Sequence, residues 1–242
     1  MEATTMSVIR SQRAVSEFYT QALADGADTA ERLDAPVSDR FAAFVNGLDP
    51  GVPRTALELG YGRGTYAITL ARLGFRVVAV DQVPAEILRS RIAEQPELAE
   101  RLEIVEQRIE NYDVREQFGI VVARNVLHYL GQHQVRDLLA RCVQHAPHGA
   151  GHYLEVFTDI ERTDRRGRRV FIEDEAAYTA AGFRSVAEHL YREWEGHMTL
   201  TAYAENNSGT AIDDAVARKY FRANRIVVAA RRRAGVVSGG VA

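Results

Sequence analysis

The fold is decided by residues 55–81, which read TALELGYGRGTYAITLARLGFRVVAVD. A short apolar strand over 56–59 runs into a glycine-rich turn, a helix over 66–73 is stopped by Gly74, and a second apolar strand fills 75–80. A strand, a helix and another strand in that order predict a βαβ unit, because parallel neighbours need a crossover connection. The segment therefore predicts the start of a parallel sheet covered by helices.

The same alternation continues to about residue 230. Alternating strands and helices predict an α/β fold, with a mostly parallel sheet and helices on both faces. No helical pattern separates the last two predicted strands, so one of them is expected to run antiparallel. Further strands are expected at 102–105, 118–123, 151–157, 184–194 and 225–230, and further helices after Pro84, around 135–143 and over 173–181.

Length and composition predict one principal globular domain. The chain has 242 residues, of which 46% are hydrophobic and 26% charged. A net charge of −3 argues against nucleic acid or an anionic membrane as partner. Cys142 is the only cysteine and falls on the apolar face of the helix around 135–143, so we expect a core thiol and no disulfide. With no apolar leader or spanning segment recognised, the protein is expected to be cytoplasmic.

The position of the glycine-rich turn at the end of a strand indicates a binding site, because ligands of open α/β sheets bind at the carboxyl ends of the strands. Glycines there allow a tight turn and let a ligand approach the backbone closely. A dinucleotide fingerprint G-x-G-x-x-G would need glycine at the position held by Thr65. Glu58, just before the glycines, would repel a pyrophosphate and suits the ammonium group of a methionine moiety. The turn therefore favours a nucleoside-like cofactor.

Asp81 ends the second predicted strand. A carboxylate at this place accepts hydrogen bonds from ribose hydroxyls, whether the cofactor is NAD or S-adenosylmethionine. The competing interpretation of Asp81 is a helix N-cap ahead of Pro84, and that of the glycines is an ordinary tight turn.

With these residues in place, the chain resembles the class I S-adenosylmethionine-dependent methyltransferases. Three segments carry the resemblance: ELGYGRG at 58–64, FGIVVARNVLHYL at 118–130, and the strand that follows PHGAG at 147–151. Their order and spacing are similar to the small tellurite-resistance-type subgroup. Two positions depart from the family pattern, since Arg108 stands where an aspartate is common and Gly119 replaces the aspartate of a usual F-D pair.

The resemblance implies a Rossmann-like, seven-stranded sheet with a reversed final hairpin, and S-adenosyl-L-methionine as cofactor. Helical spacing in the first fifty residues predicts a helical lid over residues 1–50 that excludes water, ahead of a main domain over 51–233. The glycine-, valine- and serine-rich end predicts a flexible tail over 234–242. The expected reaction is methyl transfer to an oxygen or nitrogen of a small-molecule acceptor. No argument about a homodimer follows from the sequence.

The candidate site residues cluster around the predicted carboxyl edge. His128 is the candidate general base, because imidazole titrates near neutral pH; its competing interpretation is a packing residue at the start of a helix. The candidates for substrate binding are Asn125, Tyr129, Glu155 and Phe157. The candidates for cofactor binding are Glu58, Gly60, Tyr61, Gly62, Gly64, Asp81, Gln82, Arg108, Ile109, Arg124 and Tyr19.

Three alternatives compete with this assignment. His128 and His133 are five residues apart, which does not place them on one helical face, so no metal site is expected. A nicotinamide-dependent oxidoreductase is disfavoured by Thr65 and by the absence of a tyrosine followed four residues later by lysine. A protein that binds S-adenosylmethionine without transferring its methyl group stays open.

Overall fold

The computed structural model describes residues 8–10, 17, 20–21, 37–162, 170–172, 180–195, 203–205 and 221–233, and side chains at 17, 20–21, 37–156, 182–195 and 227–233. Its strands are β1 (Val8–Arg10), β2 (Thr55–Leu59), β3 (Arg76–Asp81), β4 (Leu102–Glu106), β5 (Ile120–Arg124), β6 (Gly151–Arg162), β7 (Val170–Ile172), β8 (Trp194–Glu195), β9 (Tyr203–Glu205) and β10 (Phe221–Arg232). Its helices are α2 (Asp39–Asn46), α3 (Thr65–Arg72), α4 (Glu86–Ile92), α5 (Pro96–Ala99), α6 (Gln132–His145) and α7 (Ala180–Tyr191), with 3-10 turns η1 (Ile109–Asn111) and η2 (Leu127–Tyr129).

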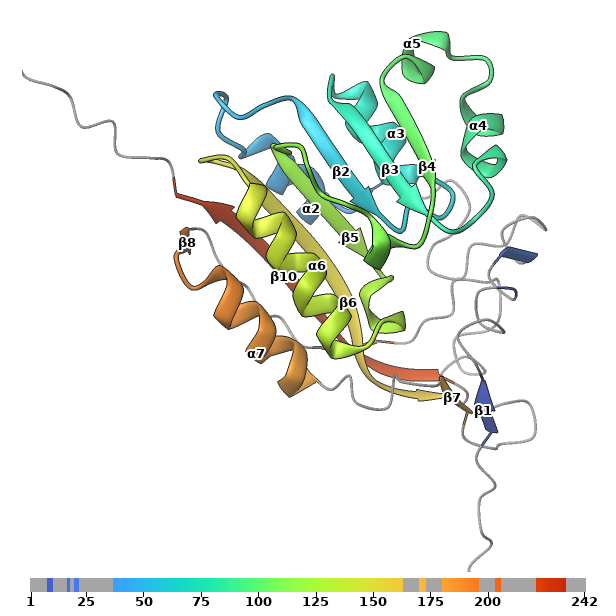
Figure 1. Ribbon diagram of the computed structural model, residues 1–242, viewed down its shortest axis with the longest axis vertical. Coiled ribbons are helices and arrows are strands. Elements are labelled where there is room, and N and C mark those ends of the chain that lie inside the picture. Colours follow the sequence, from blue (N-terminus) through green and yellow to red (C-terminus); the bar gives the residue numbers. More distant parts are fainter. Residues whose placement is uncertain are drawn as a thin grey trace, which may run out of the picture.

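The main sheet has the order β4-β3-β2-β5-β6-β10-β8, with the short β9 paired to β10 off this path (Figure 1). Strands β4 to β6 pair in parallel, and β10 pairs antiparallel with both β6 and β8. The expected mostly parallel sheet with one reversed strand is confirmed. Strands β1 and β7 form a separate parallel pair.

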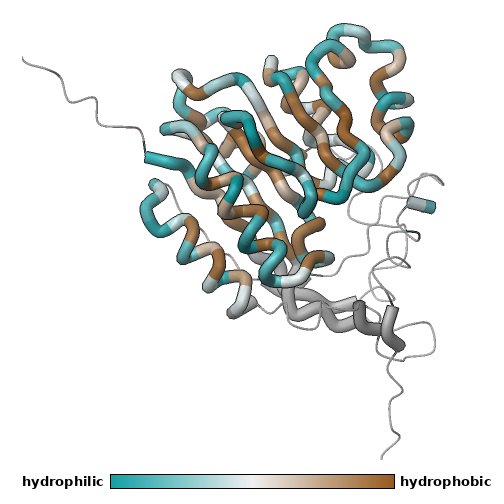
Figure 2. Tube along the Cα trace, in the orientation of Figure 1, coloured by the Kyte–Doolittle hydropathy of each residue, from teal (hydrophilic) through white to brown (hydrophobic). Residues whose placement is uncertain are grey.

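Two apolar layers lie on opposite faces of the sheet. Alternate strand residues point to opposite faces, so Ala56 and Ile120 pack with α2 and α3, whereas Leu57 and Val121 pack with α6 and α7. Figure 2 shows hydrophobic residues along the strands and the inner faces of these helices. None of the helices built from the described residues has the length and apolarity that a bilayer crossing requires.

Helix α6 follows the predicted pattern closely. Its inward face carries Val135, Leu138, Leu139 and Cys142, all buried. Burial raises the pKa of the Cys142 thiol to about 12, with a smaller opposing effect from the charge of Arg141. The thiol is therefore protonated at neutral pH, and its prediction as a core residue is confirmed.

The prediction of a strand over 184–194 is wrong. Residues 180–191 form helix α7, and only Trp194 and Glu195 extend as β8. Phe183, Val186, Ala187 and Tyr191 are buried at spacings of three, four and eight residues, which is the period of a helix packed on one face. The polar and aromatic character of the segment favoured a strand, and packing against α6 prevailed. Of the helix predicted over 173–181, residues 173–179 lie outside the described residues.

Helix α2 belongs to the core. Ser38 is its N-cap, and the side-chain oxygen accepts a hydrogen bond from the Phe41 N–H at 3.3 Å. Phe41 is fully buried, with its ring 4.6 Å from that of Tyr66 and 5.1 Å from that of Tyr153. Most of the predicted lid before α2, and the predicted tail at 234–242, lie outside the described residues.

His152 leads to a prediction about acid stability. Its ring is fully buried, and Nδ1 lies 2.9 Å from the Tyr191 hydroxyl. Burial, and to a lesser extent the charge of Arg232, lower the pKa of His152 from 6.5 to about 3. Between these values the unfolded chain binds a proton that the folded chain does not, so the free energy of unfolding should fall as pH is lowered, by about 1.4 kcal/mol per pH unit from this residue. Urea unfolding at pH 7, 6 and 5 measures the slope, which should flatten in His152→Phe; an equal slope in both proteins contradicts the assignment.

Candidate functional site

The glycine turn between β2 and α3 is built on left-handed backbone. Gly60, Gly62 and Gly64 have φ of 76°, 53° and 80°, a region that glycine adopts without strain. A Cβ at Gly60 would overlap the Val126 side chain, and one at Gly64 would overlap Leu88. At Gly62 nothing lies within 4 Å of the place a Cβ would take. The turn is therefore closed by packing on two sides and open to an approaching ligand at Gly62.

Asp81 fixes this turn from the end of the neighbouring strand. Its Oδ2 accepts the Gly62 N–H at 2.8 Å, and its Oδ1 accepts the Val83 N–H at 3.3 Å. Burial raises the pKa of Asp81, and hydrogen bonds from backbone N–H groups oppose that shift. Helix α4 begins at Glu86 and has Ala85 as its cap, so the alternative interpretation of Asp81 as a helix N-cap is wrong.

The carboxyl edge around the turn is electronegative. Glu58 is 4% exposed, and Glu106 lies beside Asp81 in the register of β3 and β4. Tyr61 is buried among these groups and donates its hydroxyl to the Val83 carbonyl at 3.3 Å. Burial, and then the charges of Asp81, Glu106 and Glu58, raise the pKa of Tyr61 far above 10. An edge of this kind favours a cationic ligand group and disfavours a pyrophosphate.

Two of the predicted site residues pair with each other. Arg124 is the last residue of β5, and Glu155 is its register partner in β6. The Nε of Arg124 lies 2.9 Å from the Oε2 of Glu155. The other Glu155 oxygen accepts the Tyr153 hydroxyl at 2.8 Å. The Arg124 guanidinium lies over the Tyr66 ring, 4.0 Å from its centroid. Sequence reasoning missed the two tyrosines, although Tyr153 and Glu155 share one strand face and their alternation was a readable signal.

The residues after β5 turn sharply at Asn125. Its φ is 51°, and it is the one non-glycine residue with positive φ among those the structure describes. Its N–H bonds the Glu155 carbonyl at 2.8 Å. His128 follows in η2, only 1% exposed, with its ring 4.1 Å from that of Tyr129. The turn brings the predicted base and two predicted substrate residues to the end of the same strand.

The remaining candidates follow β3 or β4 in the chain, or have side chains that the structure does not describe. Arg108 pairs with Glu110 in front of η1, Ile109 is buried, and Gln82 is exposed at the end of β3. Tyr19 lies outside the described residues, and Phe157 is described only by its backbone in β6. Within the described ranges, no group of three or more His, Cys, Asp or Glu side chains is arranged to hold a metal ion.

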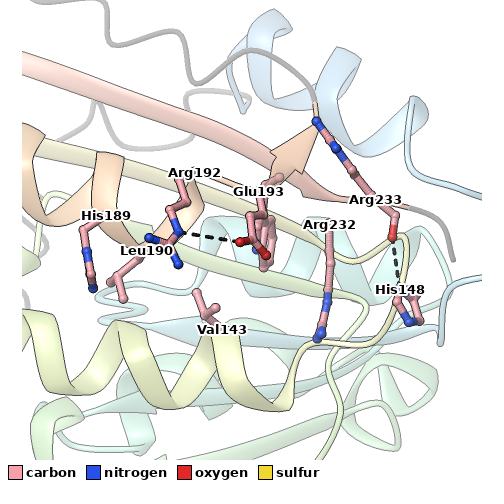
Figure 3. Close-up of a pocket in the computed structure, with 9 residues that line it drawn as sticks. Val143, His148, His189, Leu190, Arg192, Glu193, Arg232 and Arg233 are labelled. Atoms are coloured by element: carbon pink, nitrogen blue, oxygen red, sulfur yellow. Dashed lines mark hydrogen bonds and ion pairs between the residues drawn. The ribbon is translucent and has the colours of Figure 1, made fainter.

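A separate pocket of about 480 Å³ lies between α6, α7 and the end of β10 (Figure 3). It is near the amino end of β6 and contains none of the predicted site residues. Its charged groups are engaged locally: Arg192 pairs with Glu193 at 3.6 Å, and His148 bonds the Arg233 carbonyl at 3.1 Å. Because the glycine turn and the candidate base both lie at the carboxyl edge, that edge is the better candidate.

Comparisons with known proteins show which family model and which folds this chain resembles. Residues 56–149 match the family model described as a methyltransferase domain. No curated protein matches the chain by sequence. Among solved structures, the chain is similar to TehB from Haemophilus influenzae, with a TM-score of 0.57 and 16% identity over 79% of this chain, which corresponds to 62% of TehB and thus less than two thirds of it.

Two further structures match over more of their own length. The 1,6-didemethyltoxoflavin-N1-methyltransferase from Burkholderia thailandensis has a TM-score of 0.54 and 20% identity, covering 90% of this chain and 87% of its own. The N-methyltransferase NodS from Bradyrhizobium japonicum, in complex with S-adenosyl-L-homocysteine, has a TM-score of 0.51 and 18% identity, covering 88% and 98%. At these identities the similarity establishes a shared fold.

Proposed function

We propose that this chain is a class I S-adenosylmethionine-dependent methyltransferase that moves a methyl group onto an oxygen or nitrogen of a small-molecule acceptor; the methyltransferase-domain match over residues 56–149 and the shared fold support this. One observation carries the proposal: the open glycine turn is held by Asp81 in an electronegative edge that also contains Glu58. A cytoplasmic location and a natural-product acceptor belong to the same proposal.

The residues at this edge fit the cofactor. Gly62 leaves room for a nucleoside against the backbone, since no atom occupies the direction of a Cβ. The Asp81 carboxylate presents about four acceptor positions and keeps capacity for a ribose hydroxyl beside its backbone bonds. Glu58 supplies the negative charge that an amino-acid ammonium requires. A pyrophosphate would meet the same carboxylates, which disfavours a nicotinamide-dependent oxidoreductase.

Bound S-adenosyl-L-methionine supplies a methyl group that its sulfonium makes electrophilic. The task left to this chain is to hold the acceptor in line with that methyl group and to keep water away. Asn125 and Tyr129 lie at the end of β5 where an acceptor would be positioned. We assign Glu155 an indirect part, because both of its oxygens are engaged by Arg124 and Tyr153.

His128 is the proposed general base for acceptors that lose a proton. It lies just after β5, and an imidazole nitrogen can accept a proton from an acceptor held within hydrogen-bond reach. A His128→Gln variant should lower turnover and leave the affinity for S-adenosylhomocysteine unchanged. Retained turnover would remove His128 from this role.

Asp81→Ala tests the cofactor site. The variant should bind S-adenosylhomocysteine about 1–3 kcal/mol more weakly, because a ribose hydrogen bond is lost and the Gly62 N–H is left without its acceptor. Isothermal calorimetry measures this, with NAD titrated in parallel. Asp113→Ala is the control, since Asp113 is exposed and pairs with the exposed Arg115. Unchanged affinity in Asp81→Ala, or preferential binding of NAD, contradicts the assigned site.

A second assay separates catalysis from mere binding. Formation of S-adenosylhomocysteine from S-adenosylmethionine with a panel of phenol and amine acceptors should exceed formation without acceptor. A protein that binds the cofactor and forms no product with any acceptor would be a binding protein and not a transferase.

A further inference from the structure

Asn125 carries two costs that its surroundings do not offset. Its φ of 51° lies in the left-handed region, which costs free energy for a residue with a Cβ, although asparagine tolerates this region better than most. Both atoms of its amide, Oδ1 and Nδ2, are buried and have no hydrogen-bond partner among the described residues. Buried polar groups are normally satisfied, and strain of this kind concentrates at sites of function.

The fold does not depend on this side chain. The turn is held by the backbone, through the Asn125 N–H and the Glu155 carbonyl at 2.8 Å. Glycine would adopt the same φ without strain and would leave no unsatisfied amide. The side-chain amide therefore lowers the stability of the ligand-free protein. Hydrogen bonds from a bound ligand to this amide would offset that cost.

Asn125 lies beside the proposed site. The next residue, Val126, packs against Gly60 so closely that a Cβ on that glycine would overlap it. The preceding residue, Arg124, is neutralised by Glu155, so no net charge from that pair faces an incoming ligand. The rings of His128 and Tyr129 follow within the same short turn. This neighbourhood therefore combines the amide of Asn125, which has no hydrogen-bond partner among the described residues, with two planar rings and an ion pair without net charge.

An amide presents a donor and an acceptor side by side in one plane. A carboxylate or an ether offers only acceptors and leaves the Asn125 oxygen unsatisfied, whereas a carboxamide or lactam edge satisfies both atoms at once. We propose that Asn125 selects the acceptor, and that the acceptor is an uncharged, planar molecule with an amide-type edge. This inference rests on the proposed function and adds the substrate class to it.

The test uses three bicyclic probes of similar size with the full chain saturated in S-adenosylhomocysteine. Quinolin-2-one has a lactam edge, quinoline has only an acceptor, and 2-naphthol has only a hydroxyl. Ligand-observed NMR titration gives their relative affinities. We expect the dissociation constant of quinolin-2-one to be about tenfold lower than those of the other two probes.

Substitutions then assign the preference to the amide. Asn125→Gly should remove the preference for quinolin-2-one while the unfolding midpoint stays equal or rises, and Asn125→Asp should also weaken the lactam because the donor is lost. Asn111→Gly, at an exposed asparagine in η1, should retain the preference.

Each other outcome is decisive. Equal affinities for the three probes, or a preference that survives Asn125→Gly, overturn the inference and leave the proposed function standing. Loss of S-adenosylhomocysteine binding in Asn125→Gly would mean that the amide serves the cofactor, which also overturns it. Failure of the wild-type chain to bind S-adenosylhomocysteine removes the proposed function and this inference with it.

Discussion

Glu155→Gln is expected to lower the free energy of unfolding by about 3–5 kcal/mol, the usual cost of removing one partner of a buried ion pair. The side chains of Glu155 and Arg124 are 5% and 12% exposed, so the substitution leaves a guanidinium charge in a poorly hydrated place. Glutamine keeps an oxygen for the Tyr153 hydroxyl, which confines the change to the charge. Urea unfolding of the two proteins at pH 7 measures the difference.

An exposed pair provides the matched control. Glu103 lies 3.4 Å from Arg76, and their side chains are 57% and 43% exposed. Water screens such a pair, so Glu103→Gln should cost only about 0–1 kcal/mol. If Glu155→Gln cost no more than Glu103→Gln, the ion pair at the end of β5 would have no special part in stability. A combined Arg124→Met, Glu155→Leu variant should recover much of the loss, because no charge is left unpaired.

Gly119→Ala is expected to cost about 3 kcal/mol, at the upper end of what overpacking a tight site costs. A Cβ at Gly119 would lie well inside contact distance of the Pro53 carbonyl oxygen, which is backbone and cannot rotate away. The strand cannot shift easily either, because the Gly119 N–H bonds Thr55 at 2.8 Å and its carbonyl accepts the Gly151 N–H at 2.9 Å. Urea unfolding again gives the value.

Gly51→Ala is the control for this substitution. The only atom near its Cβ would be Asp49 Oδ1, at 3.2 Å, which is the end of a movable side chain. Its cost should stay below about 1 kcal/mol. Equal costs at the two positions would show that the sheet yields at Gly119. Because a Cβ has no room against the Pro53 carbonyl oxygen, only glycine fits at position 119 without a shift of the backbone.

Local patterns were sufficient to predict the elements around the glycine turn. Apolar runs of four to six residues, a glycine cluster and a carboxylate at the next strand end placed β2, α3, β3 and Asp81 correctly. Helix α6 was predicted from its 3.6-residue period, and the same period in α7 was outweighed by aromatic content. Secondary structure was therefore predictable where one periodicity dominated.

The contacts inside the site were not predictable from local patterns. The pairing of Arg124 with Glu155 depends on the register between β5, which ends at Arg124, and β6, which begins only at Gly151. The left-handed turn at Asn125 contains no glycine that would have indicated it in the sequence. Relations of this kind are set by tertiary packing, so sequence reasoning named the residues and missed how they pair.

The edge-to-face cluster of Phe41, Tyr66 and Tyr153 has a consequence for dividing this chain into parts. Phe41 of α2 touches the rings of Tyr66 and Tyr153, and these two tyrosines hold Arg124 and Glu155 respectively. The segment that matches the methyltransferase family model begins at residue 56, downstream of α2. A fragment cut to that match, or a chimera that borrows its leading helix from a relative, would lack the ring that packs against Tyr66 and Tyr153 beside the Arg124–Glu155 ion pair.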